Sequence, residues 1–356
     1  MPRRQPVQPS THTRRKRIRG IAGLSGRTAL AVAGAAALVA AGLGAMTAGA
    51  AENGSDERGD RQTAEVPAHA VTGYVQNFDN GAQKQRISEL PDAYDIIAVA
   101  FADSTATAGE ITFNLDPALA PSEDELKADI AKKQEEGKSV IISVGGEKGN
   151  VSVTDDASAT AFAESTLALM EEYGFDGVDI DLEHGINATY MSKALKQIAE
   201  KAPDMVLTMA PQTIDMQSTE TEYFKLALDV KDILTVVNMQ YYNSGSMNGC
   251  DGKVYSQGTV DFLTALACIQ LEGGLDPSQV GIGTPASSQA AGSGYVEPSV
   301  VTAALDCLTK GENCGEFKPE KTYPGLRGAM TWSTNWDATA GNAWSDAVGP
   351  AVDALP

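Results

Sequence analysis

An octapeptide at residues 176–183, Asp-Gly-Val-Asp-Ile-Asp-Leu-Glu, limits the folds open to this chain more than any other segment. Successive side chains of an extended strand point to opposite faces, so its apolar residues share one face and Asp179, Asp181 and Glu183 share the other. Three neighbouring carboxylates resist joint ionisation, so at least one should keep its proton well above its free pKa, as a general acid near neutral pH requires. A solvated acidic edge strand or a cation site is the alternative, but the helix-like stretch that follows favours a buried parallel strand.

Length and charge narrow the class of protein. The chain has 356 residues, of which 42% are hydrophobic, and its formal net charge is −20. This is enough apolar material for one sizeable core. An acidic chain repels nucleic acid and anionic membranes, so neither is an expected partner, whereas a neutral polymer is compatible. We expect the protein to be a monomer.

The first 50 residues have the layout of an export signal. A basic stretch precedes an apolar, Ala-rich run at 29–45, and small residues follow as far as Ala50. This order predicts a signal peptide at 1–50 and a secreted protein with no membrane contact after cleavage. The pair Arg14-Arg15 leaves a twin-arginine export route open, and an uncleaved membrane anchor is the alternative.

Cysteine usage agrees with export to an oxidising compartment. All four cysteines lie in the C-terminal third of the chain, and four cysteines allow three pairings. Chain proximity favours Cys250 with Cys268 and Cys307 with Cys314. None of them has metal-ligand spacing with the three histidines, so no metal site is expected.

Beyond a linker at 51–67, which is predicted to be disordered, strand-like and helix-like segments alternate through a folded domain at 68–356. Ser122 and Glu125 predict a capping box at the start of one helix, and Gly174 is expected to end another. Eight strand-helix units in about 290 residues fit a single (β/α)8 TIM barrel. A doubly wound open sheet is the alternative, but no glycine-rich phosphate loop follows the first strand. The predicted strands are 70–76, 96–102, 139–145, 177–183, 205–211, 235–242, 280–285 and 328–334.

The barrel prediction places catalytic groups at the C-terminal ends of the strands. Six side chains fall at or near those ends: Glu183, Tyr74, Phe101, Gln212, Tyr242 and Trp332. The aromatic rings among them offer apolar faces for stacking. Neutral amides at Gln212, Gln240 and Asn243 offer hydrogen bonds, and this mixture suits an uncharged ligand rich in hydroxyls and amides.

Several motifs resemble glycoside hydrolase family 18, the chitinases. The most specific is Asp176-x-x-Asp179-x-Asp181-x-Glu183, which is similar to the family's catalytic signature. The resemblance spans residues 70–340 and implies a secreted bacterial chitinase on a (β/α)8 barrel. The other segments that resemble family positions are Ser143-Val144-Gly145-Gly146, Met209-Ala210-Pro211-Gln212, Gln240-Tyr241-Tyr242-Asn243 and Trp332.

The resemblance also implies a role for each acid. Glu183 would protonate the glycosidic oxygen, while the substrate's own 2-acetamido oxygen acts as the nucleophile and gives net retention. Asp181 would hold the acetamido N–H and help keep Glu183 protonated, and Asp179 would exchange a proton or hydrogen bond with Asp181. Three coupled acids titrate as a set. Tyr242 would donate its hydroxyl to the acetamido carbonyl.

The remaining positions divide into binding and support. The residues expected to bind substrate are Trp332, Gln212, Gln240, Asn243, Met209, Tyr74 and Phe101. Asp176 has the opposite strand parity to the other acids and is expected to support the start of their strand. Ser143, Gly145 and Gly146 are also expected to be structural, because small residues leave room around the acidic strand. No cofactor is expected.

Two departures from the family pattern bear on substrate binding. Many members have Asp where this chain has Asn243, which replaces a carboxylate contact by a neutral amide. The segment 287–327 is too short for the extra small domain of one subfamily, so a shallow, open cleft and cleavage within chains are expected. Two other functions stay open: an endo-β-N-acetylglucosaminidase acting on N-glycan cores, which uses the same chemistry, and a non-catalytic chitin-binding lectin, which would usually lack Glu183.

Overall fold

The computed structural model describes residues 65–356. The predicted signal peptide at 1–50 and most of the predicted linker lie outside the described residues. The end of that linker differs from the prediction, since Val66 packs against the apolar cluster inside the barrel and Arg327 donates to the carbonyl oxygens of Pro67 and Ala68. Residues 66 and 67 of the predicted linker therefore contact the folded domain. Within residues 65–356 no helix combines the length and apolar composition that a membrane span requires.

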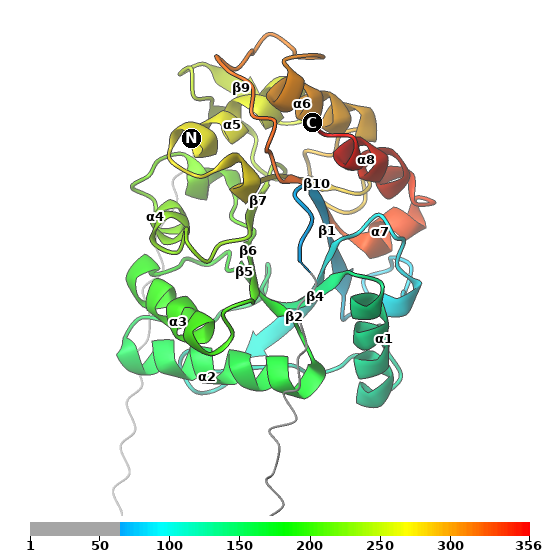
Figure 1. Cartoon of the computed structure of the whole chain (residues 1–356), viewed down its shortest axis with the longest axis vertical. Coiled ribbons are helices and arrows are strands. Elements are labelled where there is room, and N and C mark those ends of the chain that lie inside the picture. The colour runs from blue at the N-terminus through cyan, green and yellow to red at the C-terminus, as the bar shows by residue number, and fades with distance from the viewer. Residues whose placement is uncertain (1–64) are drawn as a thin grey trace, which may run out of the picture. The chain divides into compact units, whose positions relative to one another are not determined.

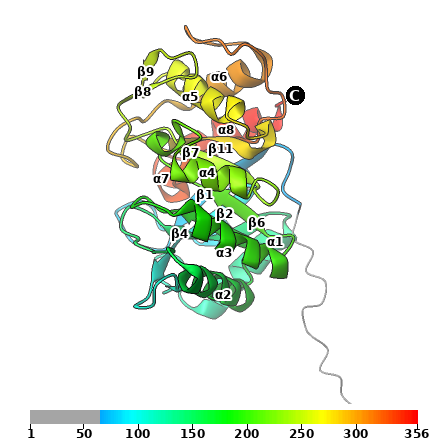
Figure 2. The same cartoon turned by 90° about the vertical axis from the view of Figure 1, so that its left-hand side faces the viewer.

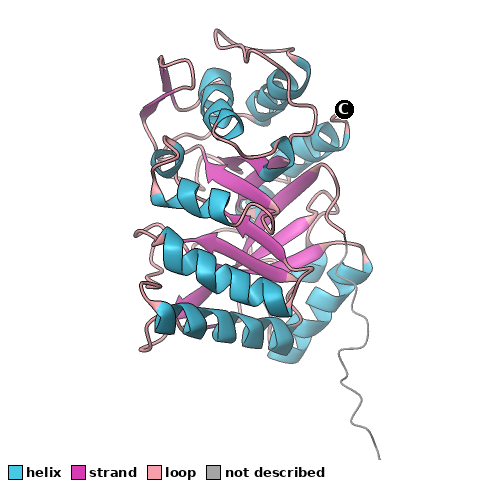
Figure 3. Cartoon of the chain, turned by 60° about the vertical axis from the view of Figure 1, so that its left-hand side comes forward, coloured by secondary structure: helices cyan, strands magenta, loops and turns pink. Residues whose placement is uncertain are grey.

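Eight parallel strands form a closed barrel at the centre of the described chain (Figures 1 and 3). The pairing runs from β1 through β11, β10, β7, β6, β5, β4 and β2, and β2 pairs with β1 to close the ring. The (β/α)8 prediction is confirmed, and each barrel strand overlaps a predicted one. Their bounds are β1 Ala70–Gln76, β2 Ile96–Ser104, β4 Ser139–Gly145, β5 Gly177–Asp181, β6 Val206–Met209, β7 Val236–Gln240, β10 Val280–Pro285 and β11 Gly328–Trp332.

Helices surround the barrel, as Figure 3 shows. Their ends follow local sequence signals: Ser122 caps α1 by accepting the N–H of Glu125 at 3.3 Å, and α2 ends at Gly174 in the left-handed conformation. The Glu125 side chain pairs with Arg86, so only half of the predicted capping box forms. The helices are α1 Glu123–Glu135, α2 Asp156–Tyr173, α3 Ala188–Lys201, α4 Glu222–Asp229, α5 Val260–Glu272, α6 Pro298–Lys310, α7 Thr334–Thr339 and α8 Ala343–Asp353.

The first strand-helix unit departs from the regular pattern. Between β1 and β2 the described chain forms a 3-10 turn, η1 (Ile87–Glu89), in place of an α-helix. Arg86 ties this connection to α1 through paired hydrogen bonds of 2.9 Å to the carboxylate of Asp129. Short strands also occur outside the barrel: β3 (Ile111–Thr112) pairs with β2. The hairpin β8 (Ser246–Asn248) and β9 (Val254–Ser256) follows β7 and packs against α5 (Figure 2).

Apolar side chains fill two layers. Outward-facing residues such as Val178 and Ile180 join a large cluster between the strands and the helices. A smaller cluster inside the barrel contains Ile141, Val206 and Met330. Strand alternation therefore sends the apolar residues of β5 outward and its acids into the barrel.

Both cysteine pairs favoured by chain proximity form disulfides, Cys250–Cys268 and Cys307–Cys314. The first links the hairpin region to α5, and the second closes the C-terminal end of α6. Cys268 and Cys307 are buried within their helices, so these bridges attach loops to the helical layer.

Candidate active site

Asp179 lies at the centre of the barrel and is fully buried. Its carboxylate accepts three hydroxyl hydrogen bonds, from Tyr74 at 2.8 Å, Ser143 at 2.6 Å and Thr208 at 2.6 Å. Burial raises the pKa of Asp179, and the three hydroxyl donors act against that rise because they stabilise the charged form. Four barrel strands, β1, β4, β5 and β6, thus meet at one carboxylate.

Asp181 lies two residues further along β5 and is 4% exposed. It accepts a hydrogen bond of 2.9 Å from Nε2 of Gln240 at the end of β7. Burial raises the pKa of Asp181 well above its ordinary value, and repulsion by Asp179 and then Glu183 adds to the rise. The surroundings of Asp181 therefore favour its protonated form.

Glu183 follows the C-terminal end of β5 and is half-buried. Gln240 Nε2 donates to one of its carboxylate oxygens and Gln212 Nε2 to the other, each at 3.3 Å. The backbone that carries it is held by Tyr223 of α4, whose buried hydroxyl accepts the N–H of Leu182 at 2.7 Å. Two neutral amides and one tyrosine thus fix this carboxyl at the mouth of the barrel.

Tyr242 follows β7 and is 8% exposed. Burial raises the pKa of its phenol well above 10, and repulsion by Asp181, Glu183 and Asp179 contributes in that order. Its hydroxyl therefore stays protonated and has a hydrogen available to donate.

Three aromatic rings line up at the ends of β1, β2 and β11. Trp332 stacks on Phe101 with ring centroids 5.6 Å apart, and Phe101 stacks on Phe78 at 6.5 Å. All three rings are half-buried, so part of each stays open to solvent. Phe78 is absent from the sequence-predicted set because it lies outside the predicted strand 70–76.

The β4 residues leave space for β5, as expected of small side chains. A Cβ atom at Gly145 would lie 2.2 Å from the carbonyl oxygen of Asp181. The next N–H, from Gly146, donates to that same oxygen at 2.7 Å. Asp176 lies at the opposite end of the strand, where its carboxylate accepts the N–H of Val140 at 2.7 Å. It supports the start of β5.

Two predicted substrate contacts differ in the structure. Met209 is fully buried in the cluster between strands and helices, so its side chain faces away from the barrel interior. The pattern assigned it to the wrong face, because Thr208, its neighbour on β6, takes the inward position. Tyr74 is 1% exposed and donates to Asp179, so it orients an acid instead of offering a ring to a sugar.

The amides Gln240 and Asn243 also make contacts within the protein. Gln240 is 6% exposed, and its Nε2 donates to Asp181, to Glu183 and to the carbonyl oxygen of Ala210. Asn243 adopts the left-handed conformation at φ 51°, and its side-chain oxygen accepts the N–H of Ser293 at 3.0 Å. Gln240 bridges two acids, and Asn243 attaches the end of β7 to the loop after β10.

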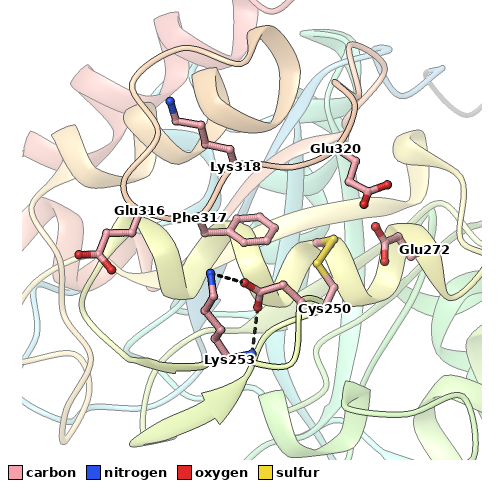
Figure 4. Close-up of a pocket in the computed structure, with 9 residues that line it drawn as sticks. Cys250, Lys253, Glu272, Glu316, Phe317, Lys318 and Glu320 are labelled. Atoms are coloured by element: carbon pink, nitrogen blue, oxygen red, sulfur yellow. Dashed lines mark hydrogen bonds and ion pairs between the residues drawn. A yellow bond between two sulfur atoms is a disulfide. The ribbon is translucent and has the colours of Figure 1, made fainter.

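A pocket lies around the Cys250–Cys268 disulfide (Figure 4). Its volume is about 350 Å³ and Phe317 lies at its centre among charged side chains. Both sulfur atoms near Glu272 are bonded to each other, so this group offers no free thiolate to a metal. None of the barrel acids lines it.

The closed barrel and the acids at the end of β5 agree with the architecture that the sequence motifs predict. Residues 70–347 match the model of glycosyl hydrolases family 18, and the chain belongs to that family. The chain is 35% identical over 329 residues to Exochitinase 1 of Streptomyces olivaceoviridis, and the match covers 78% of this chain and 55% of that protein. It therefore spans about half the length of that relative.

Two solved structures are also similar. A chitinase A candidate from Streptomyces coelicolor is 72% identical, with a TM-score of 0.80 over 81% of this chain and 99% of that one. A family 18 chitinase from Chromobacterium violaceum is 33% identical, with a TM-score of 0.76 over 82% of this chain and 85% of that one.

Proposed function

We propose that this protein is a chitinase that hydrolyses β-1,4 bonds between N-acetylglucosamine units. The observation that carries the proposal is the arrangement of Asp179, Asp181 and Glu183, which rise in order from the buried centre of the barrel to its mouth. The names of the relatives support the same substrate class.

In the proposed reaction Glu183 donates its proton to the glycosidic oxygen as the bond from that oxygen to the anomeric carbon breaks. The acetamido oxygen of the same sugar bonds to the anomeric carbon from the opposite face and gives an oxazolinium ion. Water then attacks that carbon, the new C–O bond to the acetamido oxygen breaks, and Glu183 takes a proton from the water. Two inversions at one carbon give net retention.

Asp181 and Tyr242 would orient the acetamido group. A protonated Asp181 beside Glu183 avoids two adjacent negative charges, and its carboxyl can pair with the acetamido N–H as the ring forms. The Tyr242 phenol, whose raised pKa keeps it a donor, would hold the acetamido carbonyl in line for attack. Asp179, fixed by three hydroxyls, would supply the negative charge that favours the proton on Asp181.

We further propose an open cleft and cleavage within chitin chains. Between β10 and β11 the described chain carries α6 and its two connecting loops, and the shortness of this segment supports the proposal. The aromatic rings Phe78, Phe101 and Trp332 would stack on sugar rings along one wall. One relative is named an exochitinase, so product sizes from long substrates decide between the two modes.

We propose that the protein acts outside the cell. The export-signal pattern at 1–50 and two disulfides agree with a secreted protein.

Replacement of the acid tests the proposed function. Glu183→Gln keeps the shape of the side chain but removes its proton, so turnover of chito-oligosaccharides should fall by about 10³-fold or more, with little change in binding. Turnover is measured by product formation and binding by calorimetry, with Glu171→Gln on the exposed face of α2 as a control. Retention of more than a few per cent of activity would sink the assignment. Intact binding by a wild-type protein that cuts neither chitin nor N-glycans would favour the lectin.

A further inference from the structure

A fourth carboxyl group belongs to the segment that follows β6. Asp215 belongs to the 3-10 turn η2 (Thr213–Met216), which follows β6, and it is half-buried. Burial raises its pKa and repulsion by the Glu183 carboxylate adds to that rise, while the N–H of Gln212 lowers it. The negative charges of Asp215 and Glu183 therefore repel each other.

Gln212 connects Asp215 to Glu183 through hydrogen bonds. Its carboxylate accepts the backbone N–H of Gln212 at 3.1 Å, and its own N–H donates to the carbonyl oxygen of Gln212 at 3.0 Å. On its other side the Gln212 backbone bridges to Gln240 of β7. With its backbone held from both sides, Gln212 directs Nε2 at Glu183, 3.3 Å from one carboxylate oxygen.

The turn that carries Asp215 is itself anchored. The hydroxyl of Thr221, at the start of α4, donates to the carbonyl oxygens of Asp215 and Ser218. These bonds fix the turn to α4, which also supplies Tyr223 beneath Glu183.

The charged groups around Asp215 leave Glu183 as its main electrostatic partner. Elements α4, α5 and β7 pack on η2, and β7 contains no titratable side chain. Asp215 raises the pKa of Tyr223 on α4 through a minor repulsion, after burial and Asp181. The other charged groups of α4 lie at the surface or have their own partners: Glu222 and Lys225 pair at 3.7 Å, and Asp229 is exposed. In α5, Asp261 accepts the N–H of Phe317, and Glu272 lines the pocket of Figure 4.

We propose that Asp215 is a positioning residue of this active site, which fixes Gln212 against Glu183 by its hydrogen bond and helps the acid keep its proton by its negative charge. This inference rests on the proposed role of Glu183 as the acid. A fixed negative charge disfavours loss of a proton nearby, so it extends activity toward higher pH.

Two substitutions separate the hydrogen bond from the charge. Asp215→Asn keeps an oxygen that can accept the Gln212 N–H, so kcat at its acidic plateau should stay within about twofold of wild type. Loss of the charge should move the basic limb of the kcat profile to lower pH by about half a unit, which is about a threefold loss of rate on that limb. Asp215→Ala loses both functions and should lower kcat at every pH by about tenfold, with KM little changed.

The control is Glu220→Gln, which removes one negative charge from an exposed side chain paired with Lys225 on the neighbouring turn. It should leave the profile in place. The proposal would be overturned if the basic limbs of the kcat profiles of Asp215→Asn and wild type coincide. It would also be overturned if Glu220→Gln shifts that limb by the same amount.

A measurement without turnover keeps this test separate from the proposed function. The carboxyl 13C signals of the site, followed by NMR against pH in the full chain, should titrate at lower pH in Asp215→Asn than in wild type. Coincident titration curves would overturn the proposal even if the chain cleaves chitin. Loss of chitin cleavage by wild type would instead count against the proposed function.

Discussion

Asp179 and Asp181 carry the same side chain on the same strand, yet their surroundings assign them different tasks. Three hydroxyl groups donate hydrogen bonds to Asp179. Asp181 accepts one hydrogen bond from a side-chain amide and lies between two other acids. The donors stabilise a negative charge on Asp179, and the neighbouring charges favour a proton on Asp181. The alternation of the octapeptide is enough to predict that the acids share a face.

The raised pKa of Asp181 gives a pH-dependent stability. A buried acid with a raised pKa contributes stability that is fully present below its unfolded pKa and is lost as pH rises through its folded pKa. Asp181→Asn removes that titration, so its melting temperature relative to wild type should increase with pH.

Calorimetry from pH 3 to pH 8 measures this trend, with Asp92→Asn as a control because the Asp92 side chain is 96% exposed. A difference between Asp181→Asn and wild type that stays constant over this range would contradict the assignment of the buried proton.

Other partners of the acids could not be predicted from the sequence. Thr208 and Tyr223 are not themselves part of a motif, and their hydroxyls reach β5 because the barrel brings β6 and α4 beside it. The inward direction of Gln240 likewise depends on its register beside β6. Side chains alternate between the two faces of β6, so recognition of Thr208 as inward-facing would have excluded Met209 from the barrel interior.

Among the elements, β4 and β5 show how backbone contact fixes the acids. Gly145 adopts φ +118°, and a Cβ atom there would overlap the Asp181 carbonyl. The N–H that follows holds the same carbonyl, so a shift of β4 would move the strand that carries the acids.

Gly145→Ala should therefore cost about 3 kcal/mol of unfolding free energy or more, since it combines backbone strain with overpacking. Denaturant titration measures this loss. Gly137→Ala is the matched control: its φ is +81° but nothing lies within 4 Å of its Cβ position, so only the strain of about 1 kcal/mol is expected. Equal losses in the two variants would mean that the contact with β5 contributes nothing.

The elements themselves were largely predictable, because barrel strands covered on both faces are apolar runs with clear ends. The connection between β1 and β2 was not predictable, since its conformation depends on the contact of Arg86 with Asp129, which is distant in the sequence. The hairpin β8–β9 has three-residue strands that are too short to show a period. Its attachment to α5 comes from the Cys250–Cys268 bridge.

For the molecule as a whole, the described chain closes on itself through β1, which pairs with both β2 and β11. Both disulfides lie in the C-terminal third, where they attach loops to α5 and α6. The barrel could be predicted from the order of strands and helices. The contact of Val66 with the barrel could not be predicted, because it is made with apolar side chains that the folded barrel brings together.

Removal of each disulfide should destabilise the protein by an amount set by the loop that it closes. The Cys250–Cys268 bridge spans 18 residues and its replacement by two serines should cost about 3 kcal/mol, whereas Cys307–Cys314 spans 7 residues and should cost about 2 kcal/mol. Denaturant midpoints of the two double variants measure the difference. No loss in either variant would show that the bridges do not constrain the unfolded chain.

The anomer of the first product tests the proposed chemistry most directly. We would incubate the protein with the tetramer of N-acetylglucosamine and follow the new reducing ends by NMR before mutarotation. Attack by the acetamido oxygen followed by water predicts dimers that appear first as the β-anomer. Products that appear first as the α-anomer would contradict a retaining mechanism and, with it, the roles proposed for Asp181, Glu183 and Tyr242.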